Sequence, residues 1–299
     1  MTNLTNEVAS RLLGKKIDLQ DEYNPEILVA VPRFENRQQY GINNNSLPFK
    51  GWDIWHCYEF SCLRNNGTPI TRVLKICYNC ESEYIIESKS LKLYLNSYNM
   101  AKCGANEEEC LLKCKTLIEK DLSLKLKTKV IANFIGTNCA KIPIFEGFIN
   151  ISSITNENDI KISHYKEAPE VLVSENINEE KEYYLTYDSL RSNCRVTHQP
   201  DFGDVFIYYK SKKHIKEESL VEYLCSFRSE YHFHEECCEM IYKRIADILN
   251  PNDTIFVGAL YTRRGGIDIC PVRWNNNYNA KDINNLIDTK IFARYGIKQ

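Results

Sequence analysis

Hydrophobic positions along the first half of the chain change their spacing in a regular order. Apolar and polar residues alternate over two segments joined by a turn with Asn65, Gly67 and Pro69, which predicts a β-hairpin. Spacings of three and four residues follow and predict two amphipathic helices, after which alternation returns. The expected elements are strands over residues 53–63 and 70–78, helices over 91–98 and 111–122, and strands over 124–134 and 144–151.

The second half of the chain repeats this order of elements. When the halves are aligned, Glu108-Glu109-Cys110 falls on Glu235-Glu236-Cys237, and the apolar positions of the second helix coincide. A ββααββ unit therefore occurs twice. The expected elements of the second unit are strands over residues 183–190 and 205–209, helices over 219–228 and 235–249, and strands over 254–261 and 266–270.

A polar stretch separates the two units. Residues 152–181 are rich in Asn, Glu and Lys and are expected to form a linker or a surface excursion. We expect an N-terminal module over residues 1–155, a connecting segment over 156–180 and a C-terminal module over 181–299.

The repeated unit predicts an α+β fold class. A ββααββ unit forms an antiparallel sheet with its helices packed on one face. Such a sheet has long edges that a soluble protein must pair or cover. Two units in tandem would form half of a barrel, so we expect a homodimer that closes it.

Composition and charge indicate which classes of binding partner are not expected for this chain. The 299 residues carry 38 basic and 40 acidic side chains, a net charge of -2, and the basic residues are scattered along the chain. Because binding through nucleic-acid phosphates usually needs a basic excess, no direct nucleic-acid partner is expected. The longest aliphatic stretch, residues 27–31, is far shorter than the roughly 20 residues that span a bilayer, so no membrane partner is expected. With no export signal, we expect a cytoplasmic protein whose 13 cysteines are reduced, mostly buried thiols.

The loops differ most between the halves, and one of them carries a candidate nucleophile. Where the first half has a short turn, the second half has the segment over residues 192–204. Cys194 is followed seven residues later by Asp201, and a turn at Pro200 would fold this carboxylate back toward the thiol as an acid/base partner. A buried inert thiol with a carboxylate that caps a turn is the alternative.

The segment ESKSLKLY over residues 87–94 is a second candidate site. Ser88 or Ser90 is expected to cap the helix that begins here, which puts Lys89 and Lys92 in or beside its first turn. The helix dipole disfavours positive charge at this end by roughly 0.3 to 1 kcal/mol, so the lysines favour a bound anion such as a phosphate. Two solvated lysines on a surface helix are the alternative.

Two further motifs of the second half carry polar groups suited to a ligand. His234 and Glu235, at a helix start, offer a donor and an acceptor to a flat heterocycle, although an acidic first turn is also ordinary capping chemistry. In Arg263-Arg264-Gly265-Gly266 the guanidinium groups suit a phosphate, and a plain hairpin turn is equally consistent with the glycines.

Neither a metal nor a Rossmann-type dinucleotide site is expected. Cys77 and Cys80 form one CxxC pair without a second pair at zinc spacing, and neither the His/Cys cluster over residues 232–238 nor Cys103 and Cys110 completes a familiar ligand set. The chain contains no GxGxxG string. Any dinucleotide is therefore bound in another way.

Together these sequence motifs resemble those of one family, the queuosine-pathway nitrile reductases, in its long two-module form. The members of this family are NADPH-dependent 7-cyano-7-deazaguanine reductases. The most specific parts of the resemblance are residues 87–94 and 192–201. It implies the tunnelling fold, in which tandem ββααββ modules have antiparallel sheets with helices on one face. It also implies that two NADPH reduce the nitrile of 7-cyano-7-deazaguanine to an aminomethyl group through a covalent cysteine thioimide, a step in tRNA queuosine biosynthesis.

The resemblance also implies a role for each site residue. Cys194 resembles the thiolate that adds to the nitrile carbon, and Asp201 resembles the proton donor. No metal is implied. Substrate contacts are implied for Ile86, Glu87, Ser88, His234 and Glu235, and NADPH contacts for Ser88, Lys89, Arg264 and Gly265.

Two other functions stay open on the residues alone. A zinc-dependent tunnelling-fold hydrolase of a pterin or purine would contain stoichiometric zinc. A non-catalytic purine- or tRNA-binding module is disfavoured by the weak net charge and by the pairing of Cys194 with Asp201.

Overall fold

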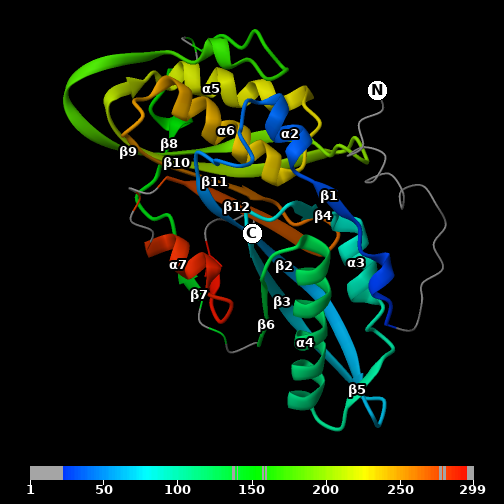
Figure 1. The fold of residues 1–299 in the computed structure, drawn as a ribbon. Coiled ribbons are helices and arrows are strands. Elements are labelled where there is room, and N and C mark those ends of the chain that lie inside the picture. Colours follow the sequence, from blue (N-terminus) through cyan, green and yellow to red (C-terminus); the bar gives the residue numbers. More distant parts are fainter. Residues whose placement is uncertain are drawn as a thin grey trace.

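One sheet runs through both halves of the molecule (Figure 1). The computed structural model describes residues 23–136, 139, 141–156, 158, 160–275, 278 and 281–294. The sheet has nine strands in the order β6-β3-β2-β12-β11-β10-β9-β8, with β5 paired to β2 outside this path. The two halves join where β12 pairs antiparallel with β2.

The second half forms a complete ββααββ unit, as the sequence predicts. Its four strands are consecutive antiparallel neighbours in the sheet. The elements are β9 (Ser174–Asn193), β10 (Pro200–Ile215), α5 (Glu217–Cys225), the 3-10 turn η5 (Ser226–Ser229), α6 (His234–Ile248), β11 (Thr254–Tyr261) and β12 (Ile267–Trp274).

The start of β9 corrects the predicted connecting segment. Residues 174–180, which the sequence analysis places in the connection, are the first residues of this strand. Most of their side chains are exposed, so the polar composition of this end of β9 resembles that of a linker.

The first half begins with the same order of elements, but the prediction of a strand over residues 124–134 is wrong in its first part. Helix α4 continues to Leu126, which is buried and extends the four-residue spacing of Ile118 and Leu122. The helical period prevails there, and the strand begins only at Val130. The elements are β2 (Lys50–Arg64), β3 (Pro69–Asn79), α3 (Ser88–Asn96), β5 (Lys102–Gly104), α4 (Glu107–Leu126) and β6 (Val130–Ile135).

The strand predicted over residues 144–151 is also wrong. Phe145 and Gly147 have φ values of 56° and 87°, which interrupt an extended conformation. Only β8 (Ile149–Asn150), which pairs with β9, remains of the predicted strand. The short strand β7 (Lys141–Pro143) comes before it and pairs with β13 (Phe292–Arg294). Within the described residues, β6 therefore has a strand neighbour on one side only.

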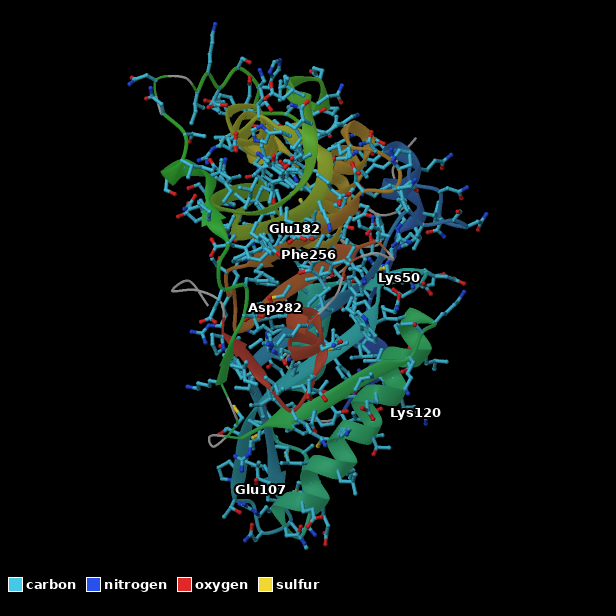
Figure 2. All side chains as sticks on the ribbon, turned by 90° about the vertical axis from the view of Figure 1, so that its left-hand side faces the viewer. Lys50, Glu107, Lys120, Glu182, Phe256 and Asp282 are labelled. Atoms are coloured by element: carbon cyan, nitrogen blue, oxygen red, sulfur yellow. The ribbon has the colours of Figure 1, made fainter. Side chains whose placement is uncertain are left out.

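The four long helices cover one face of the sheet, as predicted, with α3 and α4 on the first half and α5 and α6 on the second (Figure 1). The opposite face is covered by α7 (Lys281–Ile287), which the sequence analysis does not predict. Figure 2 shows this helix, with Asp282, on the side of the sheet where Phe256 lies. The remaining short elements are η1 (Pro25–Ile27), β1 (Ala30–Pro32), α2 (Phe34–Gln39), β4 (Tyr84–Ile86), η2 (Ile151–Ser153) and η4 (Pro169–Val171).

The cysteines are free thiols, as predicted. All thirteen are unbridged, and only Cys139, Cys194 and Cys225 are not buried. Among the described residues, no helix has both the length and the apolar character needed to cross a membrane.

Candidate active site

A cavity of about 290 Å³ lies where the first and second halves of the sheet meet. Its lining comes from the β9–β10 loop, the starts of α3 and α6, the end of β4, the β11–β12 turn and nearby strands. Every residue that the sequence analysis assigns to catalysis, substrate or cofactor lines this one cavity: Ile86, Glu87, Ser88, Lys89, Cys194, Asp201, His234, Glu235, Arg264 and Gly265.

Cys194 lies in the tight loop between β9 and β10. The loop is closed by backbone hydrogen bonds from Cys194 N–H to Gln199 O (2.8 Å) and from His198 N–H to Cys194 O (2.9 Å). The N–H of Thr197 points at the Cys194 sulfur, 3.5 Å away, and the thiol is half-buried. The backbone donor and the closed loop hold the sulfur in one place at the cavity, so the site is suited to a nucleophilic cysteine.

Asp201 lies on β10, where register pairing with Ser192 brings it back beside the loop. Its side chain is only 6% exposed and is bound on both oxygens, by Arg264 Nη1 at 2.5 Å and by His234 Nε2 at 3.3 Å. The His234 ring is itself fixed by parallel stacking on Tyr261, with centroids 3.7 Å apart. Asp201 is therefore held by groups on two other elements, and the alternative in which it caps a turn is wrong.

Glu235, the second residue of α6, presents a buried carboxyl group to the cavity. The residue is 1% exposed, and neither oxygen has a hydrogen-bond partner among the described residues. Burial, reinforced by the nearby Asp53, raises the pKa of Glu235 to about 8. The neighbouring Glu236, whose Oε2 accepts from Phe233 N–H at 2.9 Å, caps the helix instead. Glu235 is thus free to accept hydrogen bonds from a ligand.

Near Glu235 lies a buried ionic network that the sequence analysis missed. The Asp53 carboxylate forms ion pairs with Arg33 and, at 2.8 Å, with Arg273. The Glu239 carboxylate pairs with Arg273 at 2.9 Å and accepts hydrogen bonds from Nε and Nη2 of Arg37. Three arginines and two carboxylates leave a formal charge of 3 − 2 = +1, which an ionised Glu235 would balance. A charged residue inside a strongly apolar strand, such as Asp53 in β2, was the signal available in the sequence.

Glu87 caps helix α3, which corrects the sequence analysis. Its carboxylate accepts from the N–H groups of Lys89 (2.9 Å) and Ser90 (2.7 Å), so neither Ser88 nor Ser90 is the cap. Because a carboxylate already occupies this helix N-terminus, the phosphate site predicted on these backbone N–H groups is wrong. Burial raises the pKa of Glu87. The hydrogen bonds from the N–H groups of Lys89 and Ser90 and the positive charge of Lys89 oppose this effect only in part.

The β11–β12 turn and α3 meet at the rim of the cavity. Gly265 and Gly266 have φ values of 60° and 80°, as a two-residue hairpin turn of this kind requires, so the predicted tight turn is confirmed. Lys92 Nζ donates to Gly265 O at 2.6 Å and pairs with Glu59 at 3.1 Å. Lys89 is exposed, and its ammonium group is placed to meet a ligand from solvent.

Several other lining residues are given no role at the site by the sequence analysis, although some of them lie in or beside its motifs. Trp55 and Phe233 supply apolar surface, and Gln199 lies beside the Cys194 loop. His232 is buried and lies 3.1 Å from both Tyr40 Oη and Glu230 Oε2. Burial lowers the pKa of His232, but hydrogen bonds to acidic neighbours outweigh burial and raise it overall.

Two family models match this chain. The one described as "Nitrile reductase, 7-cyano-7-deazaguanine-reductase N-term" matches residues 19–134, and the one described as "QueF-like protein" matches residues 200–280. Three relatives carry the name NADPH-dependent 7-cyano-7-deazaguanine reductase. The protein of Rickettsia felis is 40% identical over 272 residues, which are 90% of this chain and 94% of that protein. That of Rickettsia canadensis is 39% identical over 94% of this chain and 98% of its own, and that of Colwellia psychrerythraea is 37% identical over 91% and 95%.

These matches cover both halves of the chain, including the loop with Cys194 and the start of α3. They agree with the family that the motifs of residues 87–94 and 192–201 resemble. The chain therefore belongs to the nitrile reductase family, the 7-cyano-7-deazaguanine reductases.

Proposed function

We propose that this chain reduces the nitrile of 7-cyano-7-deazaguanine to an aminomethyl group, with two NADPH and through a covalent thioimide on Cys194. As a member of the nitrile reductase family, the chain is an oxidoreductase of the queuosine pathway. One observation carries the proposal: four distant segments that the sequence singles out converge on one cavity. This cavity contains a half-buried thiol, a carboxylate held by two ionic contacts and a buried carboxyl group without a hydrogen-bond partner among the described residues.

Cys194 is the proposed nucleophile. Its thiolate adds to the nitrile carbon, which forms a carbon–sulfur bond and converts an unreactive triple bond into an imine-like carbon. Asp201, held by Arg264 and His234, carries the proton between the thiol and the nitrile nitrogen. Addition loses no atoms, so the enzyme gains the full mass of the substrate.

Glu235 and Glu87 are the proposed recognition groups for the heterocycle. The pyrimidine edge of a deazaguanine carries adjacent N–H donors, and the buried carboxyl groups that line the cavity offer acceptors. Binding of those donors favours the ionised form of Glu235, which Arg33 and Arg273 of the network beside it also favour. Ile86, Ser88 and His234 complete the proposed substrate contacts.

The rim of the cavity suits NADPH. Lys89 and Arg264 are exposed or half-exposed cations there, and Ser88 and Gly265 adjoin them, so these four residues would hold the dinucleotide. NADPH supplies the hydride for each of the two reductions.

The proposed reaction has a defined stoichiometry. Purified chain given 7-cyano-7-deazaguanine should consume NADPH, followed by its absorbance, at two molecules per substrate. A ratio of one, or no consumption with saturating substrate and cofactor, would contradict the proposal.

Glu235→Gln should weaken substrate binding but stabilise the free protein. Loss of one charge-assisted acceptor of roughly 1.5 to 3 kcal/mol corresponds to about 10- to 100-fold weaker binding, measured by calorimetry. The pKa of Glu235 is raised from 4.5 to about 8, so the native wild type binds more protons than the unfolded chain between these values and loses stability as pH rises through them. The variant has no such loss, so its Tm advantage should be absent below pH 4.5 and largest above pH 8.

Glu182→Gln is the matched control, because Glu182 is an exposed acidic residue of β9 (Figure 2). It should change neither binding nor the pH dependence of Tm. Unchanged substrate affinity in Glu235→Gln would remove this residue from the site.

Lys89→Ala should raise KM for NADPH about ten- to hundred-fold, since one charge-assisted phosphate contact is lost. Adduct formation on Cys194 in the absence of NADPH should be preserved. Raised salt should reproduce part of the effect in the wild type, because an exposed charge is screened.

Lys120→Ala, on the exposed side of α4 (Figure 2), is the control and should leave KM unchanged. If Lys89→Ala has a wild-type KM at low ionic strength, this lysine is merely solvated.

We also propose a cytoplasmic homodimer that acts on the free 7-deazapurine, without nucleic acid, membrane or catalytic metal. The edge of β6, which has no second strand neighbour within the described residues, supports association through the sheet. The unbridged cysteines support a reducing compartment.

A further inference from the structure

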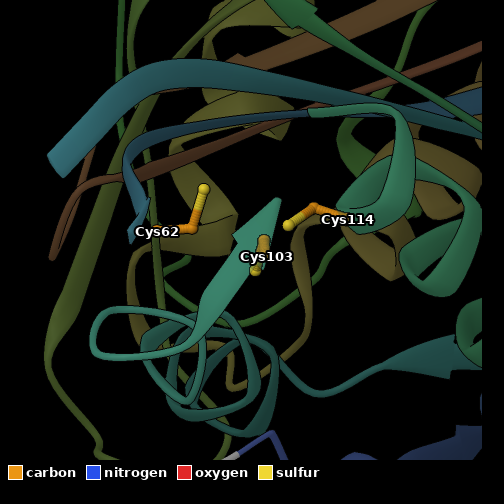
Figure 3. A group of neighbouring side chains, drawn as sticks. All are labelled: Cys62, Cys103 and Cys114. Carbon is orange, nitrogen blue, oxygen red and sulfur yellow. The ribbon is translucent and has the colours of Figure 1, made fainter. Parts of the chain in front are cut away.

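Three buried cysteines from separate segments meet in the core of the first half. Cys62 lies on β2, Cys103 on β5 and Cys114 on α4, and their sulfur atoms all lie within 4.8 Å of one another. Figure 3 shows the three side chains gathered between the strands and the helix. Cys103 is 8% exposed and the other two are fully buried, so an ion could enter only past Cys103.

A fourth thiol adjoins this cluster. Cys110 lies one helical turn before Cys114, on the same buried face of α4, and interacts with Cys62. Its sulfur lies 3.5 Å from Gly104 O and 3.7 Å from Leu63 O, so it borders both strands that carry the other thiols. Three thiols therefore meet from β2, β5 and α4, and a fourth, from the same face of α4, adjoins them.

The backbone around the cluster is closely packed. Strand β5 pairs parallel with the end of β2, with Leu63 opposite Lys102. A Cβ on Gly104 would lie 2.8 Å from Glu109 Cβ and 3.0 Å from Cys110 N, so only glycine allows β5 to approach the start of α4 this closely.

Sulfur-to-sulfur contact distinguishes these residues from ordinary buried cysteines, which act as small apolar side chains against hydrocarbon. Two sulfurs bound to one zinc ion at 2.3 Å in a tetrahedral arrangement are about 3.8 Å apart. The observed upper limit of 4.8 Å is close to this spacing, so small side-chain rotations would bring the thiols to an ion.

We propose that Cys62, Cys103, Cys110 and Cys114 bind one zinc ion that fastens β5 and α4 to β2. Four thiolates are a common ligand set of structural zinc, and binding releases their protons to solvent. The bound site would carry a charge of 2 − 4 = −2. None of the four cysteines lines the active-site cavity, so this site has a structural role separate from the reductase function.

The test is a titration of the reduced full chain with zinc alone against a chromophoric chelator. One equivalent should bind, and it should raise Tm. Cys103→Ser and Cys114→Ser should each weaken zinc binding more than the roughly 10- to 100-fold that loss of an outer-shell partner costs. The reductase rate of these variants at low temperature should stay close to that of the wild type.

Two controls separate this site from other thiols. Cys194→Ala, in the active-site cavity, and Cys225→Ala, whose thiol lies 3.1 Å from Tyr187 Oη, should retain the full equivalent of zinc. If a cluster variant fails to fold, cobalt added to the wild type should give a charge-transfer band of the intensity of several thiolates. Three zinc results would overturn the proposal: loss of zinc in Cys194→Ala, full zinc binding in Cys103→Ser and Cys114→Ser, or no zinc binding by the wild type. A cobalt band with the intensity of a single thiolate would overturn it as well.

Discussion

Cys194→Ala should abolish turnover, with a loss on the order of 10⁴-fold or more, because no other group at the site can form the thioimide. The fold should be unaffected, since the side chain is half-buried in a loop that backbone hydrogen bonds close. Wild-type enzyme mixed with substrate and no NADPH should gain the mass of the substrate in an intact-mass measurement, and the variant should gain nothing.

Cys225→Ala is the matched control for this experiment. Cys225 is another half-buried thiol of the second half, away from the cavity, and its removal should preserve both the adduct and turnover. An unshifted wild-type mass at saturating substrate would exclude the covalent step, and an adduct in Cys194→Ala would assign it to another residue.

Asp201→Asn should slow turnover by a factor on the order of 10² to 10⁴, the usual range for a lost acid/base group. The amide keeps the shape of the carboxyl group and can still accept from Arg264, so substrate and NADPH binding should change little. Adduct formation should slow as well, because the proton of the thiol must reach the nitrile nitrogen.

Asp188→Asn is the corresponding control, because Asp188 is an exposed residue of β9. Its rate should match that of the wild type. Equal rates for Asp201→Asn and the wild type would remove Asp201 from the mechanism. A purely structural role would lower Tm without slowing adduct formation at a temperature at which the variant is folded.

Wherever one period dominates, the hydrophobic pattern determines the elements of this chain. The strand over residues 254–261 has the predicted bounds because apolar side chains run without interruption through the buried β11. Where two periods overlap, as at Leu124 and Leu126, the sequence alone misleads, because the burial of Leu126 against the sheet decides in favour of the helix.

The residues of the candidate site also fall into two groups, those that the sequence points to and those that only the folded chain brings together. Motifs over residues 87–94 and 192–201 point in the sequence alone to residues that line the cavity, because loop chemistry is local and the family pattern is specific. The network of Arg33, Asp53 and Arg273 cannot be assembled from the sequence, although Asp53 stands out as a charged residue in its strand. Its members lie on β2, β12 and the segment before α2 and meet only after strand pairing.

The sequence by itself determined the repeated unit, the fold class, the loop with Cys194 and part of the set of residues that line the cavity. Tertiary structure alone decided that Glu87 caps α3, that the first unit has no fourth sheet strand within the described residues, and that Cys62, Cys103 and Cys114 meet. The physical reason is that periodicity reports which face of an element is buried, whereas hydrogen-bond competition at a helix start and contacts between distant strands depend on where the rest of the chain lies.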